Sequence, residues 1–519
     1  MSVADRLAEQ ARLRPAAAAL VDGRGRRLTF SRLEEDVARA AGWLRAAGVR
    51  PGHTALVFVP VSVDLYVALL ALFRLGATAM LVDPSAGRAH LEACCGRRPP
   101  DALLAVRRAH WLRLVAPALR RIPLKVSLGG AVPGARTWPR ECASSPAPAV
   151  AVPDEAAALI TFTSGSTGRP KAAVRTHGFL LAQHRALERN LALAPGDVDL
   201  VTLPVFTLAN LASGLTTVIP EADLRRPGAV DAASIFAQVE RERVTRLAAS
   251  PAFFERLVEF GRATGRKLPG LRQLHTGGAP VFPRVLAGMR DLAPGATVGA
   301  VYGSTEAEPI AHVRWEDVSA EDLAAMRGGR GLLAGRPVPE VRLRILRDCW
   351  GAPRPATDAA GLEAETRPAG VPGEIVVAGD HVLRGYLDGV GDEETKIRVD
   401  AEVWHRTGDA GMLDEQGRLW LLGRCAARIV DDRGELYPLT VECVAMTFGE
   451  VRRAAALAVG GRRLLAIEAR EGSKDLLAKL QAAVAWARID EVRIVEKLPL
   501  DRRHNAKVDY PALRRMLGD

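Results

Sequence analysis

The residues best suited to chemistry form a loop that is rich in glycine and hydroxyl groups and ends in a lysine. The loop reads Thr163-Ser-Gly-Ser-Thr-Gly-Arg-Pro-Lys171 and follows a short apolar segment, 159–162. Gly165 and Gly168 let the backbone turn tightly, so that its N–H groups can face an anion. Lys171 adds a positive charge, and further donors come from the hydroxyls of Thr163, Ser164, Ser166 and Thr167. The segment predicts a phosphate-binding loop that differs from the Walker pattern, which requires Gly-Lys followed by Ser or Thr.

Four further segments combine glycine with hydroxyl, aromatic or charged side chains. In chain order they are Gly277-Gly-Ala-Pro280, Tyr302-Gly-Ser-Thr-Glu-Ala307, Thr407-Gly-Asp409 with Gly423-Arg424, and a lysine near the end, Lys507. By itself each residue has an ordinary structural explanation: Asp409 as a turn residue, Arg424 as a surface ion pair, Lys507 as a solvated tail residue. The chain has only eight lysines against a background of arginine, so Lys171 and Lys507 are distinctive. Their order after the phosphate loop favours one shared site.

In this order the segments resemble the motifs of the adenylate-forming superfamily, which includes acyl-CoA synthetases, the adenylation domains of peptide synthetases, and luciferases. The resemblance implies that the first loop, from Thr163 to Lys171, binds the phosphates of ATP. It implies that the adenine and ribose are bound by Gly278, Ala279, Pro280, Tyr302, Gly303, Asp409 and Arg424, with the ring of Tyr302 stacked on adenine. It also implies that Thr305 contacts the α-phosphate, that Glu306 holds Mg²⁺, and that Lys507 reaches the reacting carboxylate.

The implied reaction is the attack of a carboxylate on the α-phosphorus of ATP. Because both reactants are anions, catalysis must come from charge neutralisation and positioning. The resemblance gives this task to Mg²⁺ at Glu306 and to Lys507, with Thr163 and Thr305 as catalytic contacts. His405, beside Trp404, is interpreted as a packed structural residue rather than a general base. Glu308 is interpreted as part of a pocket wall or as a solvated group.

Departures from ordinary CoA ligases at three places, the hinge, residue 207 and the tail, indicate a subgroup. The position two residues after Arg424 is Ala426, where those enzymes carry Asp or Lys followed by glycine, and the segment 424–434 is one residue longer than usual. Thr207 stands where many relatives have histidine. The tail Arg503-His-Asn-Ala-Lys507 resembles the ending of the β-lactone synthetases of olefin and β-lactone biosynthesis.

That second resemblance implies a 3-hydroxy acid as substrate, with a long chain favoured, and no need for CoA. After adenylation, the substrate's own 3-hydroxyl would attack the activated carbonyl and close a β-lactone. Because this nucleophile is part of the substrate itself, its effective molarity at the carbonyl would be high, and a second bound substrate would not be needed. The acyl pocket is expected to run past Phe206, Leu208, Gly278 and Tyr302.

Two alternatives remain open from the residues. One is a fatty acyl-CoA or acyl-AMP ligase whose hinge and tail sequences have diverged from the usual pattern. The other is a non-catalytic member that serves as a binding or scaffold subunit, which the presence of Lys171, Glu306, Asp409 and Lys507 disfavours. The acyl chain length, the oligomeric state and any association with neighbouring pathway enzymes are left undetermined.

Strand-length apolar runs alternate with helical patterns through most of the chain, which predicts an α/β fold with parallel sheets. The family resemblance implies two α/β subdomains and a small β-barrel-like subdomain within residues 1–423. It further implies a small, mobile α+β C-terminal domain, residues 424–519, with a hinge at about 424–434. Pro- and Gly-rich stretches at 131–153 and 348–373 are expected to be connections.

The composition excludes several other classes. The chain has 519 residues, a formal charge of +11 and only 5% aromatic residues. Its arginines are scattered and aromatics are few, so nucleic acid is not an expected partner. The six cysteines show no CxxC spacing and are expected to be reduced thiols. No apolar run reaches the roughly 18 residues of a membrane span, so a cytoplasmic protein is expected.

Overall fold

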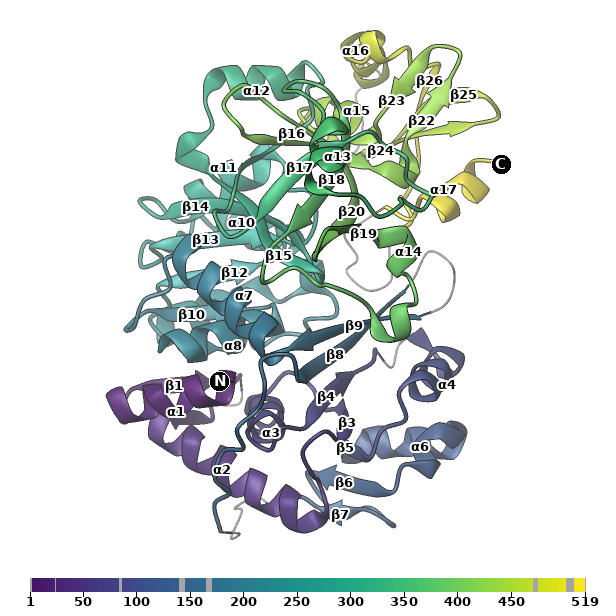
Figure 1. Cartoon of the computed structure of the whole chain (residues 1–519). Helices are drawn as coiled ribbons and strands as arrows, with labels where there is room; N and C mark the ends of the chain where they lie inside the picture. Colours follow the sequence, from purple (N-terminus) through teal and green to yellow (C-terminus); the bar gives the residue numbers. More distant parts are fainter. Residues whose placement is uncertain are drawn as a thin grey trace. The chain divides into compact units, whose positions relative to one another are not determined.

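The computed structural model describes residues 2–23, 25–83, 86–139, 145–164, 170–469, 475–500 and 508–518, and of Thr163 and Ser164 it describes only the backbone. It divides into two compact units (Figure 1). The first comprises residues 1–221, 241–246 and 380–393, and the second comprises residues 222–240, 247–379 and 394–519. The predicted phosphate-loop residues Gly165, Ser166, Thr167 and Gly168 lie outside the described residues, as does Lys507.

The first unit contains a seven-stranded sheet in the order β7-β6-β5-β3-β4-β8-β9. Its strands are β3 (Thr54–Phe58), β4 (Thr78–Leu81), β5 (Ala102–Val106), β6 (Leu124–Leu128), β7 (Arg136–Thr137), β8 (Ala157–Ser164) and β9 (Pro170–Thr176). All neighbours are parallel except β8 and β9, which form an antiparallel pair. The predicted phosphate loop therefore joins β8 to the edge strand β9. The five residues of β3 are all buried, as expected for a parallel strand covered on both faces.

The other elements of the first unit are helices and short strands. They are α1 (Val3–Leu13), β1 (Ala18–Val21), β2 (Arg27–Thr29), α2 (Phe30–Ala47), α3 (Val63–Arg74), α4 (Arg88–Arg97), α5 (Leu112–Val115), α6 (Pro117–Arg121), α7 (His177–Asn190), β10 (Val198–Val201), α8 (Pro204–Ser213) and β11 (Thr216–Val218). The Ser62 hydroxyl accepts the backbone N–H of Leu65 and caps α3, whose apolar residues are almost all buried. α2 ends at Gly48, which adopts a left-handed conformation with φ 114°.

The second unit is built on mostly antiparallel strands with helices packed beside them. Its strands run from β12 (Arg246–Ala249) and β13 (Gln273–Gly277) through β14 (Thr297–Ser304), β15 (Ala307–Arg314), β16 (Leu332–Pro337), β17 (Arg342–Leu346), β18 (Gly373–Ala378), β19 (Lys396–Val399) and β20 (Glu402–Leu413) to β21 (Leu419–Arg424). Within this unit the strand order is β17-β18-β20-β21-β16-β15-β14-β13-β12, with β19 paired to β20. Its helices include α9 (Ala232–Arg241), α10 (Pro251–Thr264), α11 (Pro283–Leu292), α12 (Ala320–Arg327) and α13 (Ala359–Ala364); α14 (Asp392–Thr395) lies where the chain enters the unit.

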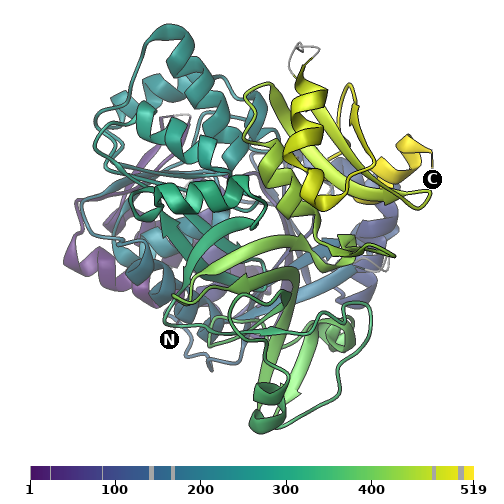
Figure 2. The ribbon, with the colours of Figure 1, turned by 90° about the horizontal axis from the view of Figure 1, so that it is seen from above.

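The last 90 or so residues of the second unit have a sheet of their own (Figure 2) and an apolar cluster of their own. The sheet is formed by β24 (Val451–Val459), β25 (Arg462–Ala469) and β26 (Glu491–Ile494), and is preceded by a hairpin of β22 (Ile429–Asp431) and β23 (Gly434–Leu436). Among the described residues it is accompanied by α15 (Pro438–Ala445), α16 (Leu476–Ala483) and α17 (Tyr510–Leu517). The α/β class predicted from the sequence is confirmed. The boundary at 423/424 does not coincide with a division between the two compact units and stays a prediction.

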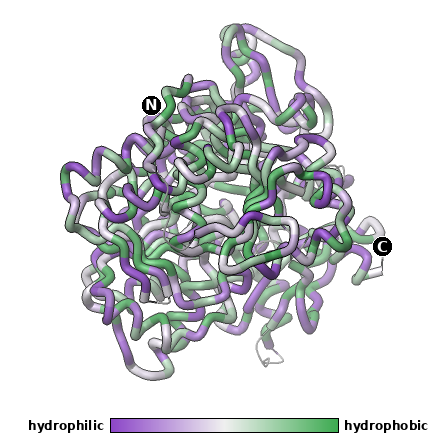
Figure 3. The backbone as a smooth tube through the Cα atoms, turned by 90° about the horizontal axis from the view of Figure 1, so that it is seen from below, coloured by the Kyte–Doolittle hydropathy of each residue, from purple (hydrophilic) through white to green (hydrophobic). Residues whose placement is uncertain are grey.

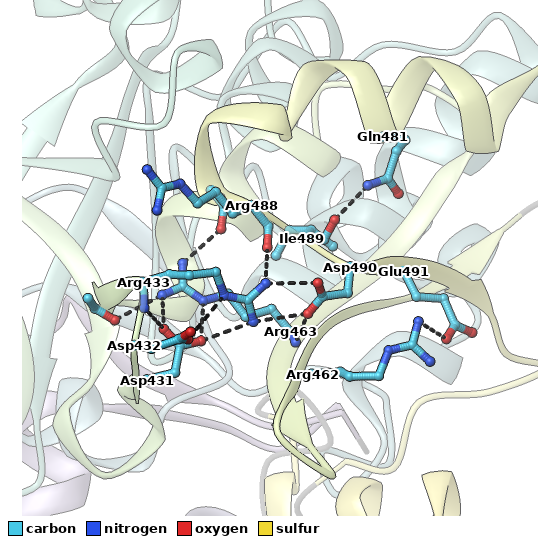
Figure 4. Close-up of polar contacts among 12 residues, drawn as sticks. Asp431, Asp432, Arg433, Arg462, Arg463, Gln481, Arg488, Ile489, Asp490 and Glu491 are labelled. Atoms are coloured by element: carbon cyan, nitrogen blue, oxygen red, sulfur yellow. Dashed lines mark hydrogen bonds and ion pairs between the residues drawn. The ribbon is translucent and has the colours of Figure 1, made fainter.

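A charged cluster ties the β22–β23 hairpin to this small sheet (Figure 4). The guanidinium of Arg463 donates to both carboxylate oxygens of Asp431, at 2.7 and 2.6 Å. Arg433 donates to both oxygens of Asp490, at 2.8 and 3.0 Å. The pKa of Asp431 is far below its ordinary value, chiefly because of the hydrogen bonds from Arg463. The hairpin is therefore fastened to β25 and β26 by paired charges.

Apolar and polar residues are interleaved along the described part of the backbone (Figure 3). Among the described residues we find no helix that combines the length and the apolar character needed to cross a bilayer.

Candidate active site

One cavity in the second unit gathers all seven residues that the sequence assigns to the adenine and ribose. Its volume is about 240 Å³. The predicted residues that line it are Gly278, Ala279, Pro280, Tyr302, Gly303, Asp409 and Arg424. They come from the end of β13, the end of β14, and the paired strands β20 and β21. The structure thus places together residues that are separated by well over a hundred positions in the chain.

Close backbone packing at the ends of β13 and β14 forms one wall of the cavity. The two strands are parallel, with Gly277 opposite Val301. A Cβ atom on Gly277 would lie 2.5 Å from the Val301 carbonyl oxygen, so this approach requires glycine. Gly278 follows with φ +83°, a left-handed conformation that turns the chain away from the strand. Tyr302 is the residue after Val301 on β14, and its side chain faces the cavity.

Asp409 links Tyr302 and Arg424. The Tyr302 hydroxyl donates to Oδ2 of Asp409 at 2.8 Å, and the Arg424 guanidinium donates to Oδ1 at 2.8 Å. Asp409 and Arg424 face each other across the β20–β21 ladder, which sets their distance. The backbone N–H of Asp409 donates to the hydroxyl of Thr407 at 3.0 Å, which fixes the backbone that carries the carboxylate.

The pKa shifts at this site favour a charged Arg424 and a protonated Tyr302 hydroxyl. The charge of Asp409 raises the pKa of Arg424 further above its ordinary value. Burial, and then the same carboxylate, raise the pKa of the Tyr302 hydroxyl, so it remains a donor. The Arg424 side chain is 51% exposed, so part of its guanidinium still faces solvent. The arrangement can accept hydrogen bonds from a diol and present an aromatic ring to a flat base.

Thr305 and Glu306 lie in the turn between β14 and β15, next to Tyr302, and are partly buried. The N–H of Glu306 donates to the Ser304 hydroxyl at 3.2 Å. Among the described residues, His, Cys, Asp and Glu do not gather in groups of three that could hold a metal. A single carboxylate still fits Mg²⁺, because this ion is commonly bound by one or two carboxylates together with substrate phosphates.

His405 lies close enough to Glu306 for the carboxylate charge to act on it. Burial, followed by the charge of Lys396, lowers the pKa of His405 to about 3, and Glu306 only partly opposes this. Nδ1 of His405 lies 3.2 Å from the Lys396 amine. The imidazole is therefore neutral and buried, as the structural interpretation of this histidine expects. Glu308, two residues beyond Glu306, is partly buried on β15.

The first unit positions Lys171 at the start of β9, directly after the predicted phosphate loop. The lysine is buried, at 7% exposure. Its stem packs on Gly391, where a Cβ atom would lie 2.7 Å from Cδ of the lysine, and its amine lies 6.0 Å from the centre of the Tyr386 ring. Arg97 donates to the carbonyl of Pro170 at 2.6 Å and also to that of Leu387. The segment 380–393 therefore packs against the chain at the end of the predicted phosphate loop and helps to fix its position.

The predicted acyl-pocket residues are divided between the two units. Phe206 and Leu208 are buried on α8 in the first unit, and Gly278 and Tyr302 line the cavity in the second. Thr207, also on α8, is buried. The acyl pocket stays a prediction.

Residues of the C-terminal segment also line the cavity, and no motif identified them. They include Leu439 and Glu442 on α15, Met446 directly after it, Arg452 and Arg453 on β24, and Tyr510 on α17. Glu442 is buried, and its Oε1 accepts the Tyr510 hydroxyl at 2.5 Å and the Ala456 N–H at 3.0 Å. Burial raises the pKa of Glu442 to about 7.

The raised pKa of Glu442 makes stability depend on pH. In the unfolded chain this carboxyl loses its proton near pH 4.5, whereas in the folded chain it keeps it to about pH 7. Stability should therefore fall as pH rises from about 4.5 to 7, by about 3 kcal/mol in all, and be flat above. Glu442→Gln keeps the acceptor oxygen and should lack this slope in urea titrations. Glu435→Gln, at an exposed site, should keep it; parallel curves for wild type and Glu442→Gln would contradict the assignment.

Tyr302→Phe should raise the KM for ATP by about fivefold and leave kcat nearly unchanged. The variant keeps the aromatic ring but loses one hydrogen bond to Asp409, a loss of about 1 kcal/mol. Tyr302→Ala, which also removes the ring, should have a clearly larger effect in the same ATP–pyrophosphate exchange assay. Equal effects of both substitutions would show that the ring contributes nothing.

Comparison with known proteins shows the family of the chain. The model of the AMP-binding enzyme family matches residues 7–387. An olefin beta-lactone synthetase of Stenotrophomonas maltophilia is 35% identical over 500 residues, which cover 91% of this chain and 87% of the relative. One of Xanthomonas campestris is 32% identical over 513 residues, covering 93% and 89%. A feruloyl-CoA synthase of Amycolatopsis is 29% identical over 508 residues, covering 94% of each chain.

Solved structures show the same fold. The amide bond synthetase McbA of Marinactinospora thermotolerans has a TM-score of 0.81 at 23% identity, covering 99% of both chains. ATP-bound MatB of Rhodopseudomonas palustris has a TM-score of 0.80 at 21% identity, covering 100% of this chain and 99% of the other. From the matched family, the similar relatives and the shared fold, the chain belongs to the AMP-binding enzymes and is an ATP-dependent, adenylate-forming ligase whose similar relatives include olefin beta-lactone synthetases.

Proposed function

We propose that this ligase adenylates a long-chain 3-hydroxy carboxylic acid and then closes it to a β-lactone. In the first step a carboxylate oxygen attacks the α-phosphorus of ATP, and pyrophosphate leaves. In the second step the 3-hydroxyl oxygen attacks the acyl carbon, the bond from that carbon to the AMP oxygen breaks, and the hydroxyl proton is released. AMP therefore leaves with one oxygen of the original carboxylate.

The residues of the second unit would bind and orient the nucleotide. Asp409 would accept the ribose hydroxyls, Arg424 would hold Asp409 in place, and the ring of Tyr302 would lie against the adenine. Glu306, together with the phosphates, would hold Mg²⁺, which supplies charge neutralisation when it is bound. Lys171 and Lys507 would add positive charge at the phosphates and at the reacting carboxylate.

The observation that carries the proposal is the 35% identity, over 91% of the chain, to an olefin beta-lactone synthetase. Two local features support it. Ala426, in the short turn after β21, is exposed and has no charge, so it differs from the Asp or Lys expected in a CoA ligase. Thr207 is buried where many relatives have histidine. Intramolecular closure needs neither a thiol channel nor a second substrate, but it does need exclusion of water from the adenylate.

We also propose that the C-terminal domain moves as one body during the cycle, with its hinge within residues 424–434, at the turn in residues 425–428, so that Arg424 stays with Asp409. Arg424 is held by Asp409 on one side of this turn, and Asp431 is held by Arg463 on the other. Rotation would break the hydrogen bonds that the Arg284 guanidinium on α11 donates to the carbonyls of Val451 and Arg452, at 2.6 and 2.8 Å. Crystals grown with and without a non-hydrolysable adenylate should differ in this rotation; identical positions would refute it.

The test of the lactone proposal is incubation with ATP, Mg²⁺ and a racemic long-chain 3-hydroxy acid, with and without CoA. A β-lactone identified by NMR and mass spectrometry, formed at the same rate in both samples, is the expected result. The matched 2-hydroxy and unsubstituted acids should give pyrophosphate but no lactone. Thioester as the only product, and only when CoA is present, would make the enzyme an acyl-CoA ligase.

A further inference from the structure

A short stretch of the first unit exposes large apolar side chains beside exposed arginines. The segment runs from a 3-10 turn, Arg107–Trp111, through α5 to α6. Trp111 is 68% exposed, Leu114 66% and Val115 53%. Among the described residues, ten large hydrophobic side chains are exposed, and Trp111 and Leu114 are the two most exposed of them. Single exposed apolar residues need no explanation, but three within five positions form a patch.

The inner side of the same segment is packed normally. His110, Ala116, Leu119 and Ile122 are buried, and the last three belong to an apolar cluster with strands of the seven-stranded sheet. His110 Nε2 lies 3.1 Å from the Val126 carbonyl. The segment is therefore fixed on the sheet, next to α4 (Figure 1), and Trp111, Leu114 and Val115 face outward because the opposite side is already buried.

The charge around the patch has one sign. Residues 102–140 contain eight lysines and arginines and no acidic residue, in a chain that has 60 Asp and Glu. Arg107, Arg108, Arg120 and Arg121 are exposed, and among the described residues no ion pair is formed by any of the four. Arg113 donates to the Pro133 carbonyl at 3.0 Å instead of to a carboxylate. The carboxylate of the nearby Glu92 accepts the Ala118 N–H at the start of α6.

We propose that this patch, residues 107–121, docks the enzyme on the surface of an anionic phospholipid bilayer. Trp111, Leu114 and Val115 would enter the headgroup and acyl boundary, and the arginines around them would contact lipid phosphates. Tryptophan with flanking arginine suits this boundary, because each side chain joins an apolar body to a polar end. A folded protein partner would be expected to offer carboxylates at fixed positions, whereas a lipid surface matches a patch of uniform charge with an apolar centre. The proposal does not depend on which acid the enzyme activates.

The experiment is flotation of the full-length protein with vesicles of phosphatidylcholine alone or with about 30 mol% phosphatidylglycerol. Binding should require the anionic lipid and weaken as salt is raised. The double variant Trp111→Ser/Leu114→Ser should lower the partition coefficient about tenfold or more. Arg120→Gln/Arg121→Gln should lower it about fivefold for each charge at low salt.

The control is Arg12→Gln/Leu13→Ser, which removes an exposed arginine and an exposed leucine from the end of α1 in the same unit. This variant should bind vesicles like the wild type, and all variants should keep the wild-type melting temperature and the wild-type rate of ATP–pyrophosphate exchange with a water-soluble acid. Absence of vesicle binding, binding that ignores the anionic lipid, or equal loss in the control would overturn the proposal. Retention on double-stranded DNA in place of vesicles would assign the patch to nucleic acid and would overturn it as well.

Discussion

Replacing Asp409 with Ala is expected to raise the KM for ATP by about two orders of magnitude. The carboxylate is the shared acceptor of Tyr302 and Arg424, at 2.8 Å from each. In the proposed complex it also accepts the ribose hydroxyls, and hydrogen bonds to a charged group contribute about 1.5–3 kcal/mol each. Its loss would remove these bonds and leave Arg424 without its partner, so binding of the nucleotide should suffer more than the chemical step. The measurement is ATP–pyrophosphate exchange as a function of ATP concentration.

Asp432→Ala is the matched control, because its side chain is 93% exposed and lies on the turn of the β22–β23 hairpin. It should leave the KM for ATP unchanged. A melting temperature of Asp409→Ala close to that of wild type would show that the effect is local. If Asp409→Ala kept a normal KM for ATP, the cavity at Tyr302, Asp409 and Arg424 would not be the nucleotide site.

Lys507→Ala is expected to slow adenylate formation by two to three orders of magnitude while changing the KM for ATP little. The ammonium group would stabilise charge that develops as the carboxylate attacks phosphorus, and loss of one such donor typically costs about 10²–10³ in rate. Lys507 lies outside the described residues, so its role rests on the family resemblance of the tail. The measurement is single-turnover release of pyrophosphate from saturating ATP.

A second measurement separates the two half-reactions. When acyl-adenylate is supplied directly, Lys507→Ala should form lactone at nearly the wild-type rate, since the lysine is assigned only to adenylation. The control Lys497→Ala, an exposed lysine ten positions earlier, should behave as wild type in both assays. Normal pyrophosphate release by Lys507→Ala would remove the lysine from the mechanism.

The motifs indicated residues that share one cavity, because these residues are parts of short segments that can be recognised in order; their assignment to the nucleotide stays a prediction. Gly278, Tyr302, Asp409 and Arg424 were assigned to one site from the motifs, and they line one cavity. The structural interpretation of His405 also agrees with the structure, since burial and Lys396 keep its imidazole neutral.

Contacts between distant segments could not be predicted in this way. Glu442 and Tyr510 line the same cavity, but each lies in an ordinary helical segment, and only tertiary packing joins them. Segment 380–393 belongs to the first unit because Tyr386 pairs with Ala173 on β9, more than two hundred positions away. The bidentate pair of Asp431 and Arg463 has no local signature for the same reason.

The most direct test of the account follows an oxygen-18 label placed in the 3-hydroxyl of the acid. If the carboxylate is adenylated and the hydroxyl then attacks the acyl carbon, the label must appear in the ring oxygen of the β-lactone, and AMP must be unlabelled. Mass spectrometry of both products from one reaction is sufficient. Label in AMP, with an unlabelled lactone, would mean that the hydroxyl was activated instead and would contradict the proposed chemistry.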